Sequence, residues 1–122
     1  MIISAGICLI SNERVKRLKT RFGNKVLEYL FTQDELDYSL SRVNWHQHCA
    51  ARFAAKCACY QAMKWDKWRD YRSIEVKKDH LGAPFLVVSG IALKHINKMS
   101  VKKIHLTLTH TNDYSIANVI FE

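Results

Sequence analysis

Four cysteines are the side chains with the strongest nucleophilic and metal-binding chemistry in this sequence: Cys8, Cys49, Cys57 and Cys59. None of them forms a CxxC pair or another recognised zinc spacing. We therefore expect free thiols and place the chain in a reducing cytoplasm. His105 is a further candidate, because it lies on the polar side of an alternating segment. His46 and His48 are two residues apart in an expected helix, so we expect both at the surface.

The positive charge of the chain is the most informative feature of its composition. With 19 lysines and arginines against 11 acidic residues, the 122-residue chain carries a formal charge of +8 at pH 7. Such a charge favours an acidic partner, which can be nucleic acid, an anionic membrane surface or an acidic protein. The sequence has no run of about 18 apolar residues, so we expect no membrane-spanning helix.

Basic residues are concentrated in one short segment, which contains Arg14, Lys16, Arg17, Lys19 and Arg21 and is followed by Lys25. They are not interleaved with aromatic side chains as on a base-stacking surface, so we do not expect a nucleic-acid partner. Two interpretations of this segment stay open. It is either a docking surface for an acidic protein or an ordinary solvated face.

These residues must be positioned by elements that the hydrophobic pattern predicts. The apolar segment 2–10 predicts a buried strand rather than a signal peptide, because no basic residues precede it. Ser11 or Asn12 is placed to cap a basic helix. Thr32 and Glu35 have the spacing of a capping box and predict the start of a second helix, which ends near residue 42.

A long helix dominates the middle of the predicted fold. Asn44 and Gln47 repeat the capping pattern and open a helix from about residue 45 to 64, which is rich in alanine. The remaining expected elements are strands over 71–78, 85–88, 101–110 and 114–121 and a helix capped by Ser89 that ends near Met99. The order predicts one α+β domain over residues 1–122, with a largely antiparallel sheet packed on the long helix.

Several segments occur in an order and spacing that is typical of one protein family. They are 1–10 with Glu13 and Arg14, 31–32 with Glu35 and Leu36, 52–56, 74–76, 82–84, and 105–110 followed by Tyr114, Ala117, Val119, Ile120 and Glu122. Each motif is weak alone, but together they cover nearly the whole chain. The chain thereby resembles the AcpS-type holo-acyl-carrier-protein synthases, which are 4'-phosphopantetheinyl transferases.

This resemblance implies an AcpS-like fold, a trimer with sites between its subunits, and a reaction of fatty acid or polyketide biosynthesis. In that reaction phosphopantetheine moves from coenzyme A to a serine of an acyl carrier protein, with magnesium on the pyrophosphate. The carrier protein is small and acidic, in agreement with the charge of +8. Arg14 matches the family's docking arginine, and we expect Arg17, Arg21 and Lys25 to extend the same docking surface.

The sequence departs from the family at the positions that the resemblance assigns to chemistry. Cys8 stands where the family has an aspartate ligand of magnesium, and Cys57 stands where it has a glutamate after Lys56. Gln61 replaces a lysine that meets the phosphates. The glycine-rich turn that follows in the family is replaced by a stretch containing Trp65 and Trp68, which we expect to fill the cofactor cleft or to form a protein-contact patch.

Soft thiols are poor ligands for the hard magnesium ion, so we expect no bound cofactor and a pseudoenzyme that binds an acyl carrier protein. His105 and Lys56 are the residual catalytic candidates. The alternative is an active synthase that uses coenzyme A and Mg²⁺ with oxygen ligands taken from Glu75, Asp66 or Asp70.

Two further questions stay open at the level of the sequence. A purely structural role in a mixed oligomer with a related, active chain is a third hypothesis beside the pseudoenzyme and the active synthase. The two cysteines at the former metal positions, Cys8 and Cys57, are expected to face each other. They would then fill space as small apolar residues, form a disulfide, or bind zinc together with His105.

Overall fold

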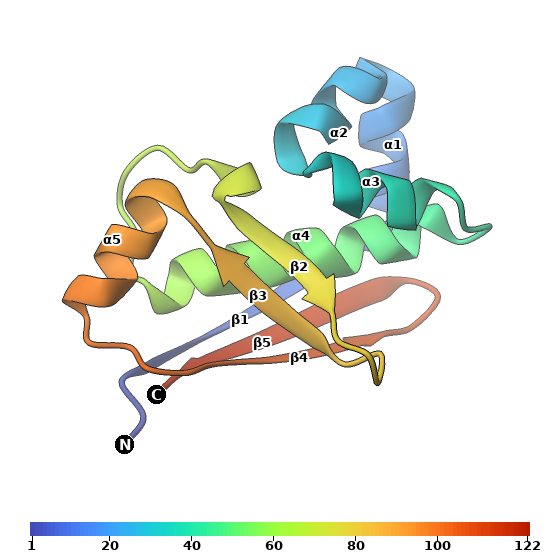
Figure 1. Cartoon of the computed structure of the whole chain (residues 1–122). Coiled ribbons are helices and arrows are strands. Elements are labelled where there is room, and N and C mark those ends of the chain that lie inside the picture. Colours follow the sequence, from blue (N-terminus) through green and yellow to red (C-terminus); the bar gives the residue numbers. More distant parts are fainter.

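One long helix, α4 (Trp45–Ala62), forms the centre of the structure, and a three-stranded antiparallel sheet lies along it (Figure 1). The computed structural model describes residues 1–122. The sheet has the order β1-β5-β4, built from β1 (Ser4–Ser11), β5 (Tyr114–Phe121) and β4 (Ile104–His110). Because β5 is the central strand, both β1 and β4 keep one edge without a strand partner in the chain.

The remaining elements form two groups around the long helix. Strands β2 (Ile74–Lys78) and β3 (Pro84–Val88) make a separate antiparallel hairpin, preceded by the 3₁₀ turn η1 (Tyr71–Ser73) and followed by α5 (Gly90–Lys98). Helices α1 (Asn12–Phe22), α2 (Asn24–Leu30) and α3 (Gln33–Leu40) gather at one end of α4, as Figure 1 shows in blue and cyan. Both termini lie together at the other end.

Close packing between α4 and the sheet depends on small residues. Ala54, Ala58 and Ala62 are fully buried on the helix. A Cβ atom placed on Gly6 of β1 would lie 2.0 Å from the carbonyl oxygen of Ala58, so only glycine fits at this point of the strand. The hydroxyl of Ser4 donates a hydrogen bond of 2.6 Å to the carbonyl of Ala62 and joins the same two elements.

The two faces of the three-stranded sheet have different environments. The face toward α4 is part of the main core, where Ala117, Val119 and Phe121 are completely buried. The opposite face is not covered by any element of the chain, and Ile7 and Leu9 are 63% and 57% exposed there. A sheet face of this kind is a candidate for association with another protein chain.

The capping and alternation predictions agree with the structure at several elements. The side chain of Ser11 accepts a hydrogen bond from the Arg14 amide, and Thr32 and Glu35 form the complete capping box. Strand β5 has the predicted bounds. In β4, Leu106 points to the core face while His105 points to the exposed face, as the alternation predicts.

Four local features differ from the predictions. Asn44 precedes α4 and Ser89 precedes α5, but neither side chain makes a capping hydrogen bond; the hydroxyl of Ser89 donates to the carbonyl of Ser73. The segment predicted as a strand over 71–78 begins with a 3₁₀ turn, and α2 is a helix that the apolar pattern did not separate. No helix in the structure has the length and apolar character needed to cross a membrane.

Candidate functional site

Cys8 and Cys57 lie against each other where β1 faces α4. Each thiol is the largest influence on the pKa of the other, and both are only partly buried. The expectation that these two residues face each other is therefore confirmed. Their correspondence to metal-binding positions rests on the resemblance and stays a prediction.

The two thiols have opposite acidities because they share a hydrogen bond. The bond from Cys57 and, more weakly, the positive charge of Arg69 lower the pKa of Cys8 to about 7, against the effect of burial. The same hydrogen bond and burial raise the pKa of Cys57. Burial also raises the pKa of Cys49 to about 11 and that of Cys59 to about 12. Cys8 is thus the one cysteine with substantial thiolate character near neutral pH.

The thiol pair does not fit the magnesium ion that the resemblance implies. Magnesium takes hard oxygen ligands in near-octahedral geometry, whereas thiolates suit softer ions. No group of three or more histidine, cysteine, aspartate or glutamate side chains is placed to hold a metal ion. The carboxylate of Glu75 accepts a hydrogen bond from the Thr32 hydroxyl, and that of Asp70 accepts one from the Arg72 amide.

His105 does not join the thiol pair within one chain. It pairs across the sheet with Ile120, which pairs with Ala5, and these side chains are on the exposed face. Cys8 is on the face toward α4, so a zinc site made of Cys8, Cys57 and His105 in a single chain is contradicted by the structure. The imidazole instead lies 3.1 Å from the carboxylate of Glu122, at an exposed position where His105 lowers the pKa of that carboxyl group.

Gln61 contacts the backbone of β1. Its side-chain carbonyl accepts a hydrogen bond of 2.6 Å from the amide of Ile7. A lysine at this position would have no acceptor for that amide, because its ammonium group only donates. The exchange of lysine for glutamine that the resemblance indicates therefore adds a link between α4 and the open edge of β1.

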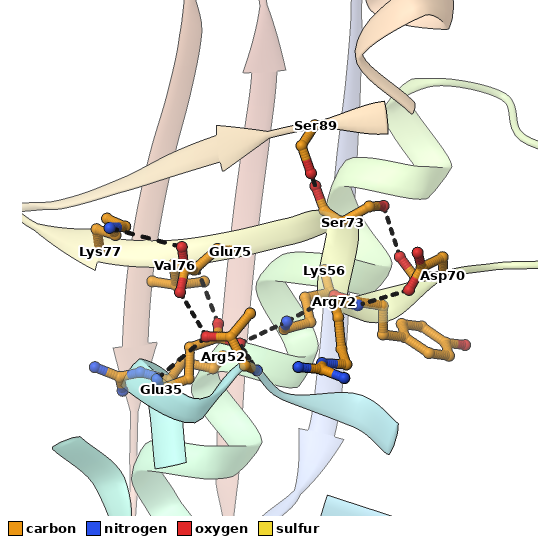
Figure 2. A network of polar contacts seen from close by, with 12 residues as sticks. Glu35, Arg52, Lys56, Asp70, Arg72, Ser73, Glu75, Val76, Lys77 and Ser89 are labelled. Atoms are coloured by element: carbon orange, nitrogen blue, oxygen red, sulfur yellow. Dashed lines mark hydrogen bonds and ion pairs between the residues drawn. The ribbon is translucent and has the colours of Figure 1, made fainter. Parts of the chain in front are cut away.

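Lys56 is placed in the core, where it cannot reach a ligand. Its ammonium group pairs with the carboxylate of Glu35 (Figure 2), at a distance of 2.7 Å. It donates a second bond of 2.7 Å to the carbonyl of Tyr71. Burial lowers the pKa of Lys56, and the charge and hydrogen bond of Glu35 oppose this shift. We therefore assign Lys56 a structural role and correct the expectation that it is a residual catalytic group.

A cluster of cations around Tyr38 is the feature that sequence reasoning missed. The guanidinium carbons of Arg42 and Arg52 lie 3.5 and 4.3 Å from the ring centroid, and the ammonium of Lys78 lies 4.8 Å from it. None of the three cations forms an ion pair with a carboxylate. Burial and the neighbouring positive charges lower the pKa of His48, which is half-buried here and not on the surface as expected.

Arg52 gives this cluster the character of an anion site. The residue is 4% exposed, and its Nε–H group is buried without a hydrogen-bond partner. A hollow of about 290 Å³ lies between α3 and β2 and is lined by Tyr38, Arg52 and Lys78 and also by the acidic residues Asp34 and Glu35. Lys78 donates to the Tyr38 hydroxyl and Arg42 to the Tyr38 carbonyl, so the buried Nε–H group of Arg52 is the donor left free for an anion such as phosphate. The only sequence signal for it was Arg52 itself, within the 52–56 motif.

The basic face of α1 is open to solvent. Arg14, Arg17 and Arg21 are spaced by three and four residues and share one side of the helix, and Lys25 is exposed at the start of α2. None of these four residues forms an ion pair. The structure thus brings the predicted docking residues together on one surface, to which Glu13 at the start of α1 also contributes.

The two tryptophans after α4 behave differently. Trp65 packs against Tyr60 and His95, with ring centroids 5.7 and 5.2 Å away, and its indole donates to the carbonyl of Trp68. Trp68 is 80% exposed beside a hollow of about 700 Å³ that Arg72 also lines. The tryptophans therefore do not fill this hollow, and a protein-contact role for Trp68 stays a prediction.

Comparison with known proteins gives one consistent set of relatives. The holo-[acyl-carrier-protein] synthase of Solibacter usitatus is 35% identical and matches 100% of this chain and 99% of its own. That of Thermodesulfovibrio yellowstonii is 33% identical and matches 98% of both chains. No protein-family model matches the sequence.

Solved structures of proteins with the same name share the fold. AcpS from Neisseria meningitidis has a TM-score of 0.88 at 28% identity and covers 100% of this chain and 99% of its own. The synthase from Bacillus anthracis, in complex with coenzyme A (3',5'-ADP), has a TM-score of 0.80 at 25% identity, covering 99% and 96%. The α+β fold predicted from the sequence is thereby confirmed.

Replacing Lys56 tests how much the buried ion pair contributes to stability. Lys56→Met leaves the Glu35 carboxylate buried without its cation, so we expect the free energy of unfolding to fall by about 3–5 kcal/mol in urea titrations. The matched control is Lys77→Met, which removes the half-exposed partner of Glu75 at 3.7 Å and should cost about 1 kcal/mol or less. Equal losses in the two variants would contradict the structural role assigned to Lys56.

Proposed function

The chain belongs to the holo-[acyl-carrier-protein] synthase family, and from this premise we propose that it binds an acyl carrier protein without efficient phosphopantetheine transfer. The observation that carries the proposal is a mismatch between two surfaces. The docking face of α1 carries arginines without ion-pair partners, whereas two thiols occupy the position that the resemblance assigns to a divalent ion. Its unpaired thiols agree with a cytoplasmic location.

The charge on α1 supports docking of an acidic helical protein. Arg14, Arg17 and Arg21 project from one face, and none of them forms an ion pair with a carboxylate of the chain. Opposite charges across an interface speed association and fix its orientation, and the effect weakens as salt increases. The net charge of +8 adds a long-range attraction in the same direction.

Three substitutions weaken the chemistry together. Cys8 and Cys57 offer sulfur where magnesium requires oxygen, and Gln61 lacks the charge of a phosphate-binding lysine. Lys64, two residues after the end of α4, has a positive φ of 54°, a backbone conformation that favours glycine. Removal of single metal ligands or oxyanion donors commonly costs orders of magnitude in rate, so the combined loss is severe.

An active synthase is a second candidate function, and one observation favours it. The cations around Tyr38, among them the buried Arg52, are suited to a phosphate group such as those of coenzyme A, which the Bacillus anthracis relative holds. In this case the chain would take coenzyme A and Mg²⁺ as an active family member would. The oxygen ligands would then come from a group such as Asp66 rather than from the two thiols.

Association into a homotrimer, or into a mixed oligomer with a related chain, is part of the proposal. The exposed apolar face of the sheet carries Ile7, Leu9 and His105, whereas the thiol pair is on the other face. A site that combines His105 with residues near Cys8 and Cys57 therefore requires a second chain. Covering this face would also remove exposed apolar surface from water.

Binding of the carrier protein is tested by titration with apo and holo acyl carrier protein at low and high salt. We expect saturable binding that weakens with salt, and about a tenfold or greater loss of affinity in Arg14→Glu/Arg17→Glu. Lys98→Glu, an exposed charge reversal on α5, is the control and should bind almost normally. Absence of binding to both carrier forms would overturn the proposal.

Transfer chemistry is tested by mass spectrometry of apo carrier protein incubated with coenzyme A and Mg²⁺. We expect little conversion to the holo mass, and at least about a hundredfold faster conversion by Cys8→Asp/Cys57→Glu/Gln61→Lys, because oxygen ligands and a phosphate cation are restored. Efficient conversion by the unmodified chain would replace the proposal with the second candidate function.

The molecular mass in solution tests association, measured by sedimentation or light scattering. A trimer, or a trimer completed by a co-purifying related chain, is expected. Ile7→Glu places a charge on the exposed sheet face and should shift the protein to monomer. Leu81→Glu, on an exposed turn before β3, is the control and should leave the mass unchanged. A monomeric unmodified chain at high concentration would contradict this part of the proposal.

A further inference from the structure

The contact between Cys8 and Cys57 joins two elements that are distant in sequence and adjacent in space. Cys8 is on β1 and Cys57 is on α4, and each thiol is the largest influence on the pKa of the other. The backbones approach closely beside the pair, since Gly6 is two residues before Cys8 on the same face and leaves no room for a Cβ against Ala58. This close approach of the two backbones beside the cysteines is what a disulfide between short side chains on β1 and α4 requires.

The surroundings distinguish this pair from the other two cysteines. Both thiols are partly exposed, whereas Cys49 and Cys59 are buried in the two cores. Arg69 hydrogen-bonds to Cys57 and places its charge near Cys8, and its guanidinium forms no ion pair with a carboxylate. A partly exposed thiol beside an unpaired cation is the usual environment of a reactive cysteine.

We propose that Cys8 and Cys57 form a thiol–disulfide exchange site for low-molecular-weight disulfides, in which Cys8 attacks and Cys57 resolves. This inference is independent of carrier-protein binding and of transferase activity.

The exchange proceeds in two balanced steps. The Cys8 thiolate attacks one sulfur of a disulfide RSSR, forms a Cys8–S–SR bond and releases one thiolate, which takes up a proton as RSH. Cys57 then loses its proton, attacks Cys8 Sγ, forms the Cys8–Cys57 bond and releases the second RSH. The protein pair is oxidised by two electrons, and RSSR is reduced to two thiols.

The order of the two thiols follows from their environments. Exchange is fastest when the attacking thiol has a pKa near the ambient pH, and the pKa of Cys8 is about 7. Cys57 donates the hydrogen bond that stabilises the Cys8 thiolate, so it remains protonated until the mixed disulfide has formed. Once Cys8 is in the mixed disulfide, it no longer carries the charge and hydrogen bond that raise the pKa of Cys57, so Cys57 can then lose its proton and attack from the adjacent position.

The test uses the purified full chain, reduced and then incubated with oxidised glutathione under native conditions. Intact-mass spectrometry should show the loss of two hydrogens, fully reversed by a dithiol reductant. Trypsin after Lys56 leaves Cys57 and Cys59 on one peptide, so fragment spectra, or a Cys59→Ala variant, must assign the crosslink to Cys57. The melting temperature should rise on oxidation, because the bond ties β1 to α4.

Single variants separate the two roles. Cys57→Ser should accumulate one glutathione on Cys8, whereas Cys8→Ser should react much more slowly because Cys57 lacks the acidic character of Cys8. Arg69→Ala should slow the first step severalfold, and the control Lys67→Ala, an exposed cation two residues earlier, should not.

Two results would overturn the inference. One is a folded, unmodified chain that keeps its reduced mass after prolonged incubation with oxidised glutathione. The other is a crosslink that includes Cys49 or Cys59 in place of the proposed pair. Because the mapping is made on the unmodified chain, it remains decisive even if a variant fails to fold.

Discussion

The buried carboxylate of Glu35 is the interaction on which the arrangement of the functional residues depends. It accepts hydrogen bonds from the amides of Thr32 and Val76 and from the ammonium group of Lys56, and so joins α3, β2 and α4 at one point (Figure 2). A charge without access to water is tolerated only when every partner is present. The three elements are therefore fixed relative to one another, and α4 becomes a rigid carrier for the residues along it.

Fixing α4 distributes its side chains over distinct surfaces. Arg52, one turn before Lys56, lies over the ring of Tyr38, whereas Cys57 and Gln61 face β1. The scaffold is held by Lys56 and by the close approach of Gly6, neither of which is among the substituted chemical positions. The residues that hold the fold and those that would perform the chemistry are separate, so the second set can change while the first persists.

Sequence patterns predicted what depends on local geometry. The Thr32–Glu35 capping box and the alternation of β4 were correct because both follow from backbone periodicity. That Glu35 also binds Lys56 and Val76 was not predictable, because these partners meet only through tertiary packing.

The cluster around Tyr38 was not predicted for the same reason, since its ring comes from α3 and its three cations come from the loop after α3, from α4 and from β2. The suggested zinc site was wrong because the sequence does not show that His105 of β4 and Cys8 of β1 lie on opposite faces of the sheet.

The thiol pair also explains how this position is stable without a cation. Two carboxylates in contact repel each other unless an ion lies between them or one of them is protonated. Two thiols avoid this cost, because one donates a hydrogen bond to the other and a single negative charge suffices, which Arg69 balances. If the resemblance assigns these positions correctly, two thiols in place of two carboxylates need no metal between them, and the exchange that we propose would use the same pair to form a covalent bond.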